Sequence, residues 1–85
     1  MKKPIILSGH ARDQLVFRGA TEEEIAIAIR SESWNSAEQG RLECRRDFAS
    51  DSVWNKRYYR KKQVRPIFVE EADAIVVVTV YVYFF

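Results

Sequence analysis

The segment AIVVVTVYVYFF, residues 74–85, carries the strongest strand signal in the chain. β-Branched and aromatic residues fill it, and neither glycine nor proline interrupts it. Its 12 residues fall short of the ~20 that a membrane-spanning helix needs. An apolar strand of this kind at an open sheet edge would promote aggregation, so we expect it at the centre of a sheet.

Strand alternation divides this segment between two faces. We expect one face to pack against helices and the other to stay open, because an antiparallel sheet is often covered on one side only. The open face would then present the hydroxyl groups of Thr79 and Tyr81 to a ligand. The predicted helix-facing set is Val76, Val78, Val80, Val82 and Phe84, and the predicted open set is Ile75, Val77, Thr79, Tyr81 and Tyr83.

Two short helices are predicted before the sheet. Ser8 is a suitable N-cap for a helix over residues 10–18, and Gly19 can end that helix in a left-handed conformation. Thr21 and Glu24 have the spacing of a capping box at the start of a second helix. The apolar stripe of that second helix is Ile25, Ala28 and Ile29.

One strand-like segment, Pro4–Leu7, precedes the helices, and four follow them, at residues 41–48, 53–61, 64–70 and 74–85. Turns are expected at residues 49–52 and 62–63. Segregation of helices and strands along the chain predicts an α+β fold. We expect two N-terminal helices packed on one face of a four- or five-stranded, mainly antiparallel twisted sheet.

Length and composition indicate one globular domain over residues 1–85. The chain is 47% hydrophobic and 31% charged, which argues against disorder. A net charge of +2 is too small to define a nucleic-acid-binding protein by itself. With one cysteine (Cys44) and one histidine (His10), the chain can form neither an internal disulfide nor a multi-histidine metal site. We therefore expect a cytoplasmic protein that uses no metal and no cofactor.

The chain has no phosphate-binding glycine loop, dinucleotide fingerprint or Ser-His-Asp order, but it contains basic, hydroxyl and carboxylate groups. Such groups suit metal-free RNA cleavage. That reaction requires a base for the 2′-hydroxyl proton, an acid for the leaving 5′-oxygen and cations for the phosphate. The candidate catalytic residues are His10, Glu43, Thr79 and Tyr81, and the candidates for phosphate or RNA binding are Arg18, Arg45, Arg60 and Lys62.

Each of these residues also has a structural interpretation. His10 can serve as a helix-capping side chain, and Arg18 can pair with a glutamate of the next helix. Glu43 and Arg45 can form a cross-strand ion pair. The run KRYYRKK at residues 56–62 combines cations with Tyr58 and Tyr59, which suits single-stranded RNA but also suits a solvated hairpin.

Several motifs together resemble a known family. They are SGHARDQLVFRGATEEEI at residues 8–25, the segment 41–48, Trp54-Asn55, KQVRPIF at residues 62–68 and the ending VVVTVYVYFF. In order and spacing they resemble a bacterial family of small domains of unknown function, grouped by fold with the barnase–EndoU–colicin–RelE toxin superfamily. The resemblance carries over His10 and Arg18 by motif, whereas Gln14 stands where many members have an arginine.

The resemblance implies a RelE- or barnase-like fold and a metal-independent endoribonuclease. It further implies the toxin of a type II toxin–antitoxin pair, acting on RNA and bound by a small acidic antitoxin. The alternative is a binding module without catalysis, either a gyrase-binding toxin of the ParE type or a partner-binding domain. A third possibility is a structural domain whose C-terminal strand pairs with a second copy to form a homodimer. No membrane partner is expected.

Overall fold

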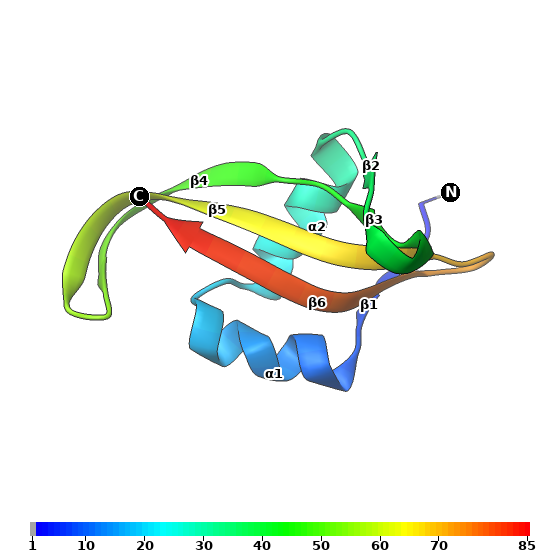
Figure 1. Ribbon diagram of the computed structural model, residues 1–85, viewed down its shortest axis with the longest axis horizontal. Helices are drawn as coiled ribbons and strands as arrows, with labels where there is room; N and C mark the ends of the chain where they lie inside the picture. Colours follow the sequence, from blue (N-terminus) through cyan, green and yellow to red (C-terminus); the bar gives the residue numbers. More distant parts are fainter. Residues whose placement is uncertain (1) are drawn as a thin grey trace.

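The computed structural model, which describes residues 2–85, is an α+β fold with two helices and a six-stranded mixed sheet. The strand order is β1-β6-β5-β3-β2, and β4 pairs with β5 beside β3. Figure 1 shows α2 behind the sheet, α1 along the β6 side, and a long β4–β5 hairpin extending away from the helices. The elements are β1 (Ile5–Leu7), α1 (Gly9–Arg18), α2 (Glu22–Ser31), β2 (Asn35–Ser36), the 3₁₀ turn η1 (Glu38–Gly40), β3 (Leu42–Glu43), β4 (Arg46–Trp54), β5 (Arg57–Glu70) and β6 (Ile75–Phe84).

The predicted helix ends are confirmed. The Ser8 hydroxyl accepts the Ala11 N–H at 3.1 Å, and Gly19 ends α1 with φ 76°. At the start of α2, the Thr21 and Glu24 side chains each accept the other residue's backbone N–H. These caps satisfy groups that helix ends leave unpaired, which explains why two helices of ten residues form so close together.

The sheet has more strands than predicted, because β2 forms at Asn35–Ser36 and the segment 41–48 divides between β3 and β4. The expected turns at residues 49–52 and 62–63 do not form. Instead β4 continues to Trp54, and β5 runs without interruption for 14 residues. The chain reverses at Asn55 and Lys56, which both have positive φ, as a type I′ hairpin turn requires. Residues 49–52 form a bulge in β4 in place of a chain reversal, since Ser50 and Asp51 have no partner on β5 and Asp51 has a φ of 42°.

The segment 41–48 was predicted as one strand, but it divides into β3 and β4 at Cys44 and Arg45. Glu43 pairs with Ile67 and Arg46 pairs with Val64, so the interruption lies opposite Arg65 and Pro66. Proline has no backbone N–H to donate, which explains why the ladder breaks at this point.

Strand β6 lies between β1 and β5, which confirms its central position. Its pairing with β1 is parallel, which the mainly antiparallel prediction did not include. The edge of β6 beyond β1 is covered as well. Beyond Leu7, where β1 ends, Gln14 of α1 covers that edge, because its side-chain oxygen accepts the Val80 N–H at 3.1 Å.

The predicted face assignment of β6 is correct only in its second half. Pairing with β5 shifts register where Ile67 meets Thr79 and Phe68 meets Val77, so that Val78 has no pairing partner on β5. This bulge reverses the alternation. As a result Ile75 and Val77 lie in the core with Val80, whereas Val76 and Val78 do not. The members of the core that pack between the helices and the sheet are Leu7, Ala11, Ala20, Ile25, Ala28, Ile29, Cys44, Val64, Phe68, Ile75, Val77 and Val80.

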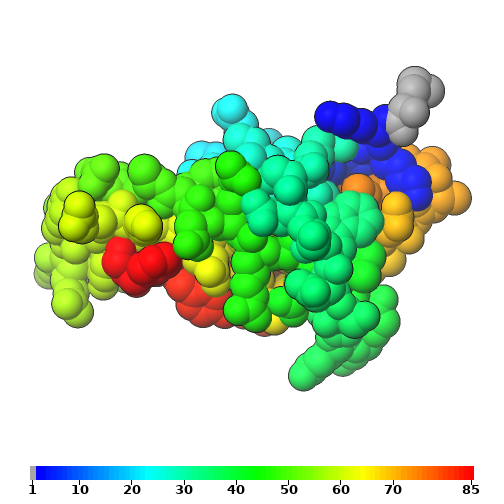
Figure 2. All heavy atoms as spheres, turned by 90° about the horizontal axis from the view of Figure 1, so that it is seen from above, coloured from blue at the N-terminus to red at the C-terminus, as the bar shows by residue number. Residues whose placement is uncertain are grey.

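An aromatic contact attaches the β4–β5 hairpin to the body of the domain. Trp54 stacks on Phe84 with ring centroids 5.1 Å apart, and Tyr59 lies 5.5 Å from the same ring. Both Trp54 and Phe84 also approach Gly19 closely at the end of α1. Figure 2 shows this hairpin as the narrow end of the molecule, with the C-terminal residues beside it. Over residues 2–85, neither helix has the length and apolar character needed to cross a membrane.

Candidate functional site

The open face of the sheet carries a group of charged and aromatic side chains, here called the open-face cluster: Arg18, Glu43, Arg45, Arg65 and Tyr81. Tyr81 of β6 and Arg65 of β5 are register partners. The Tyr81 ring lies 5.5 Å from the Arg65 guanidinium and 5.6 Å from that of Arg18, which comes from the last residue of α1. A helix and two strands therefore bring two cations to one exposed phenol.

Glu43 organises the other side of the cluster. The Glu43 side chain is 11% exposed, and its carboxylate accepts hydrogen bonds from Arg65 Nε at 3.0 Å and from Arg65 Nη2 at 2.6 Å. Arg45 Nε donates a third bond at 3.3 Å. The hydrogen bonds from Arg65 are the main reason that the pKa of Glu43 lies below its usual value, and Arg45 adds to the effect. The same contacts raise the pKa of Arg65.

These contacts favour a positioning role for Glu43. A carboxylate held between two guanidinium groups is a weak base and stays ionised at neutral pH, so it is poorly suited to exchange protons. It fixes the orientation of the Arg65 guanidinium beside the Tyr81 ring. Glu43 and Arg45 form an ion pair, but between residues two apart on one segment and not across strands. The cross-strand partner of Glu43 is Arg65, which is also the stronger one.

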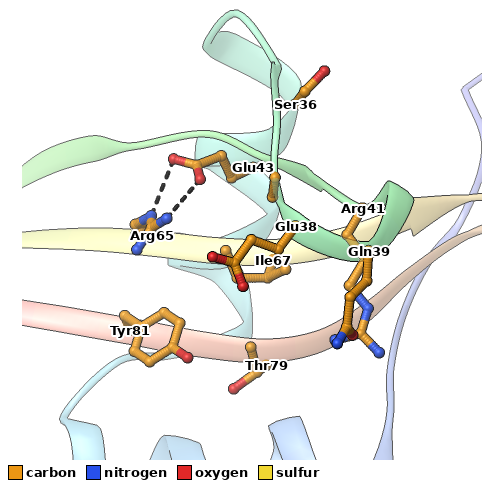
Figure 3. Close-up of a pocket in the computed structure, with 10 residues that line it drawn as sticks. Ser36, Glu38, Gln39, Arg41, Glu43, Arg65, Ile67, Thr79 and Tyr81 are labelled. Carbon is orange, nitrogen blue, oxygen red and sulfur yellow. Dashed lines mark hydrogen bonds and ion pairs between the residues drawn. The ribbon is translucent and has the colours of Figure 1, made fainter.

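Beside the cluster the surface forms a hollow of about 690 Å³. Figure 3 shows the Glu43–Arg65 pair on one side, Tyr81 and Thr79 on β6 below, and the η1 residues on the other side. The lining combines ionic and hydroxyl groups with Ile67, and comprises Ser36, Ala37, Glu38, Gln39, Arg41, Glu43, Arg65, Ile67, Thr79 and Tyr81. The two carboxylates, Glu38 and Glu43, balance the two guanidinium groups, Arg41 and Arg65, so the hollow suits a polar ligand.

Thr79 faces this hollow, but its hydroxyl donates a hydrogen bond to Gln14 Oε1 at 2.5 Å. The same oxygen accepts the Val80 N–H, so Gln14 holds α1 against the edge of β6. This contact explains a glutamine at position 14, because an arginine could not accept these two bonds. Thr79 can therefore contact a ligand only as an acceptor while this bond is kept.

His10 is exposed near the start of α1 and does not line the hollow. Within residues 2–85 its imidazole makes no hydrogen bond and no ion pair. Residues 10, 14 and 18 are spaced four apart, so they lie on one side of the helix. Gln14 and Arg18 on that side contact Thr79 and Tyr81, which places His10 next to the site without contact with the open-face cluster.

Two predicted phosphate ligands lie elsewhere. Lys62 Nζ is 2.9 Å from Glu24 and donates to the Gly19 carbonyl at 2.8 Å, so it connects β5 to the helices. Arg60 lies in the β4–β5 hairpin, beside Asp47 and Asp51. The structure thus brings together Arg18, Arg45, Glu43, Thr79 and Tyr81 but not Lys62 or Arg60.

Arg65 is the site residue that the sequence reasoning missed. It lies in the recognised motif KQVRPIF, one residue from the apolar Val64 and next to Pro66. Strand alternation in that segment places it on the face opposite Val64, which was the available signal. Its pairing with Tyr81 depends on the register of two strands, which the sequence does not specify.

No group of three or more His, Cys, Asp and Glu side chains suited to a metal ion occurs in the part of the chain that the structure describes. The chain matches no family model, no curated protein and no solved structure. The site therefore has to be interpreted from its own chemistry. Three guanidinium groups, one locked carboxylate and an exposed tyrosine are suited to binding an anionic ligand with an aromatic part.

Proposed function

We propose that the chain is a metal-independent endoribonuclease that binds single-stranded RNA across the open face of its sheet. The observation that carries the proposal is that two guanidinium groups lie over the Tyr81 ring, Arg18 at 5.6 Å and Arg65 at 5.5 Å from its centroid. Two cations can hold a phosphate group beside the phenol. The locked Glu43 keeps Arg65 in place for that contact.

In the proposed reaction the RNA 2′-hydroxyl attacks the adjacent phosphorus and loses its proton to a base. The bond from phosphorus to the 5′-oxygen breaks, and that oxygen takes a proton from an acid, leaving a 2′,3′-cyclic phosphate and a free 5′-hydroxyl. Arg18 and Arg65 stabilise the charge that builds on the phosphate. His10 and Tyr81 are the candidates for the two proton transfers, because His10 lies on the same side of α1 as Arg18.

A RelE- or barnase-like fold and a role as the toxin of a type II toxin–antitoxin pair are part of the same proposal. Two N-terminal helices followed by a sheet with one open face support it, together with the resemblance of residues 8–25 and 62–85 to that superfamily. A small acidic antitoxin would be expected to neutralise the basic open face. The proposed site of action is the cytoplasm.

The test uses purified protein and a 12-nucleotide single-stranded RNA in EDTA, with and without ribosomes. We expect a 2′,3′-cyclic phosphate product. The rate should fall about 100-fold or more in His10→Ala and Tyr81→Phe, because positioned proton transfer contributes about 10²–10⁴-fold. Arg65→Gln should be impaired, whereas the matched control Lys2→Gln should not. RNA that stays intact with and without ribosomes would contradict the proposal.

A second candidate is a binding module without catalysis, either a ParE-type gyrase-binding toxin or a partner-binding domain. The absence of contact between His10 and the open-face cluster favours it, because no histidine is then ready to move a proton. Growth arrest on induction separates the two candidates. Arrest that survives His10→Ala but is lost in Arg65→Gln would support the binding module, whereas loss in both variants would support the nuclease.

A further inference from the structure

A second basic surface lies outside the open-face cluster, on the β4–β5 hairpin at residues 47–61. This segment contains four cations, Lys56, Arg57, Arg60 and Lys61, against two carboxylates. Both carboxylates already have neutral partners. Asp51 accepts the Tyr58 hydroxyl at 2.8 Å, and Asp47 accepts the Gln63 amide at 3.1 Å.

Arg57 lies over the Tyr59 ring at 5.7 Å, but the four cations otherwise contribute little to the fold. All are exposed, and over residues 2–85 none of them takes part in an ion pair. Lys56 even adopts a φ of 67°, which is unfavourable for a residue with a side chain. A cluster of like charges opposes folding through repulsion and creates a local potential that attracts a partner of opposite charge.

The hairpin also exposes apolar and aromatic surface beside these cations. Tyr58 is 60% exposed and Val53 is 66% exposed, and the two are register partners. The hydrogen bond to Asp51 orients the Tyr58 ring, which lowers the cost of ordering it on binding. Cations interleaved with exposed aromatic rings are suited to the backbone and bases of single-stranded nucleic acid.

The hairpin is continuous with the open face through β5, which carries both Arg65 and the hairpin cations. Arg60 is five residues from Arg65, and Arg57 is eight residues from it. At about 3.3 Å per residue these separations reach about 17 and 26 Å along the strand. Figure 1 shows that the tip of the hairpin extends beyond the helices, whereas Lys62, between Arg60 and Arg65 on β5, contacts Glu24 and Gly19 on the helix side.

We propose that the β4–β5 hairpin is an RNA-binding arm that holds the backbone of a strand flanking the open-face site. The choice of RNA rests on the proposed function above. The arm distinguishes substrates by length. A dinucleotide reaches only the open-face cluster, whereas a strand of about 12 nucleotides contacts both surfaces and gains the counterion release of the arm.

Binding of a fluorescein-labelled 12-nucleotide 2′-O-methyl RNA tests this, because the methyl group blocks the attacking oxygen and separates binding from cleavage. Affinity is measured by anisotropy between 50 and about 300 mM salt, a range over which phosphate contacts dominate. Arg57→Gln/Arg60→Gln should reduce the salt slope of log K by about 1.4, since each contact to single-stranded backbone contributes about 0.7. Affinity at about 0.1 M salt should then fall about 25-fold.

The matched control is Lys2→Gln/Arg30→Gln, which removes the same charge from a different part of the surface. It should keep the wild-type slope. Each double variant loses one contact, from Arg30 to the Lys3 carbonyl in the control and from Arg57 to the Tyr59 ring in the arm variant, so the slopes are measured at a temperature where thermal unfolding shows both to be fully folded. Cleavage of a dinucleoside monophosphate should be unchanged in Arg57→Gln/Arg60→Gln. A wild-type salt slope in Arg57→Gln/Arg60→Gln, or an equal reduction of the slope in the control, would overturn the proposal that the hairpin is an RNA-binding arm. Failure of the wild type to cleave RNA, with the slope change still present, would reject the nuclease and leave the arm in place.

Discussion

Replacing Glu43 with glutamine tests how the open-face cluster is held together. The substitution keeps the size of the side chain and removes its charge. In the native protein Glu43 accepts two bonds from Arg65 and one from Arg45. The glutamine can accept from Arg65 with one oxygen only, and its NH₂ group is placed against a cation.

The expected loss of stability follows from these contacts. A hydrogen bond between charged groups contributes about 1.5–3 kcal/mol, against about 0.5–1.5 kcal/mol for a neutral one. Because the Arg65 side chain is only 23% exposed, its hydrogen bonds to Glu43 contribute at full strength to stability. The Arg45 side chain is 55% exposed, so its ion pair with Glu43 contributes close to nothing. Glu43→Gln should therefore lower the free energy of unfolding by about 1.5–3 kcal/mol at pH 7.

The loss should depend on pH with a definite sign. The pKa of Glu43 is lowered in the folded protein from its ordinary value of 4.5, so its ionised form stabilises the fold above that value. The difference between wild type and Glu43→Gln should be complete at neutral pH and should shrink as pH falls below about 4.5. Urea denaturation at several pH values measures it, with Glu38→Gln as the control. An equal difference at pH 7 and at the acid end, or no difference at pH 7, would refute the reasoning.

Three further predictions concern the fold. Gly19→Ala should lower the free energy of unfolding, measured by urea denaturation, by about 2–4 kcal/mol, because φ is 76° and a Cβ would lie 3.0 Å from two aromatic rings. The control Gly9→Ala has open space around the added Cβ and should cost little. Equal losses in the two variants would contradict the argument. Lys56→Gly should raise thermal stability by up to about 1 kcal/mol, because it relieves a positive φ in the hairpin turn, and a loss would argue against that turn. Burial raises the pKa of the Cys44 thiol to about 11, and Glu32 and Glu43 add to the effect. A thiol reagent at pH 8 should therefore label Cys44 about 100-fold more slowly in the native protein than in urea. Similar rates would show that the thiol is accessible.

Local signals predicted the helical half of the protein well. Ser8, Gly19 and the Thr21–Glu24 pair act within a few residues of sequence, and each forms the cap that its residue type favours. The central position of β6 also followed from its apolar density, because such a strand needs neighbours on both sides.

The sheet was harder to predict, because strand register is a property of two segments at once. The bulge at Val78 reverses the faces of half of β6, and nothing in the uninterrupted apolar run marks it. The turn residues at 49–52 suggested a chain reversal, but they form a bulge in β4, and the chain reverses at the Asn55–Lys56 turn.

The candidate site was predicted in part for the same reason. The open-face placement of Tyr81 survived because the bulge lies before it, and Glu43 and Arg45 share a face as expected. Arg65 was missed and Lys62 was grouped with the wrong neighbours, because only the fold shows that Lys62 binds Glu24 on the helix side. The catalytic roles of His10, Thr79 and Tyr81 stay predictions.

The most direct test of the account is a ¹H–¹⁵N NMR titration of the protein with the 12-nucleotide 2′-O-methyl RNA. RNA binding across the open face predicts shifts in the backbone amides of Arg65 and Tyr81 and in the side chains of Arg18 and Arg65, with further shifts at the hairpin. Amides on the exposed side of α2, such as that of Ile27, should not move. Shifts confined to α2, or none at millimolar RNA, would contradict the claim that this face binds RNA.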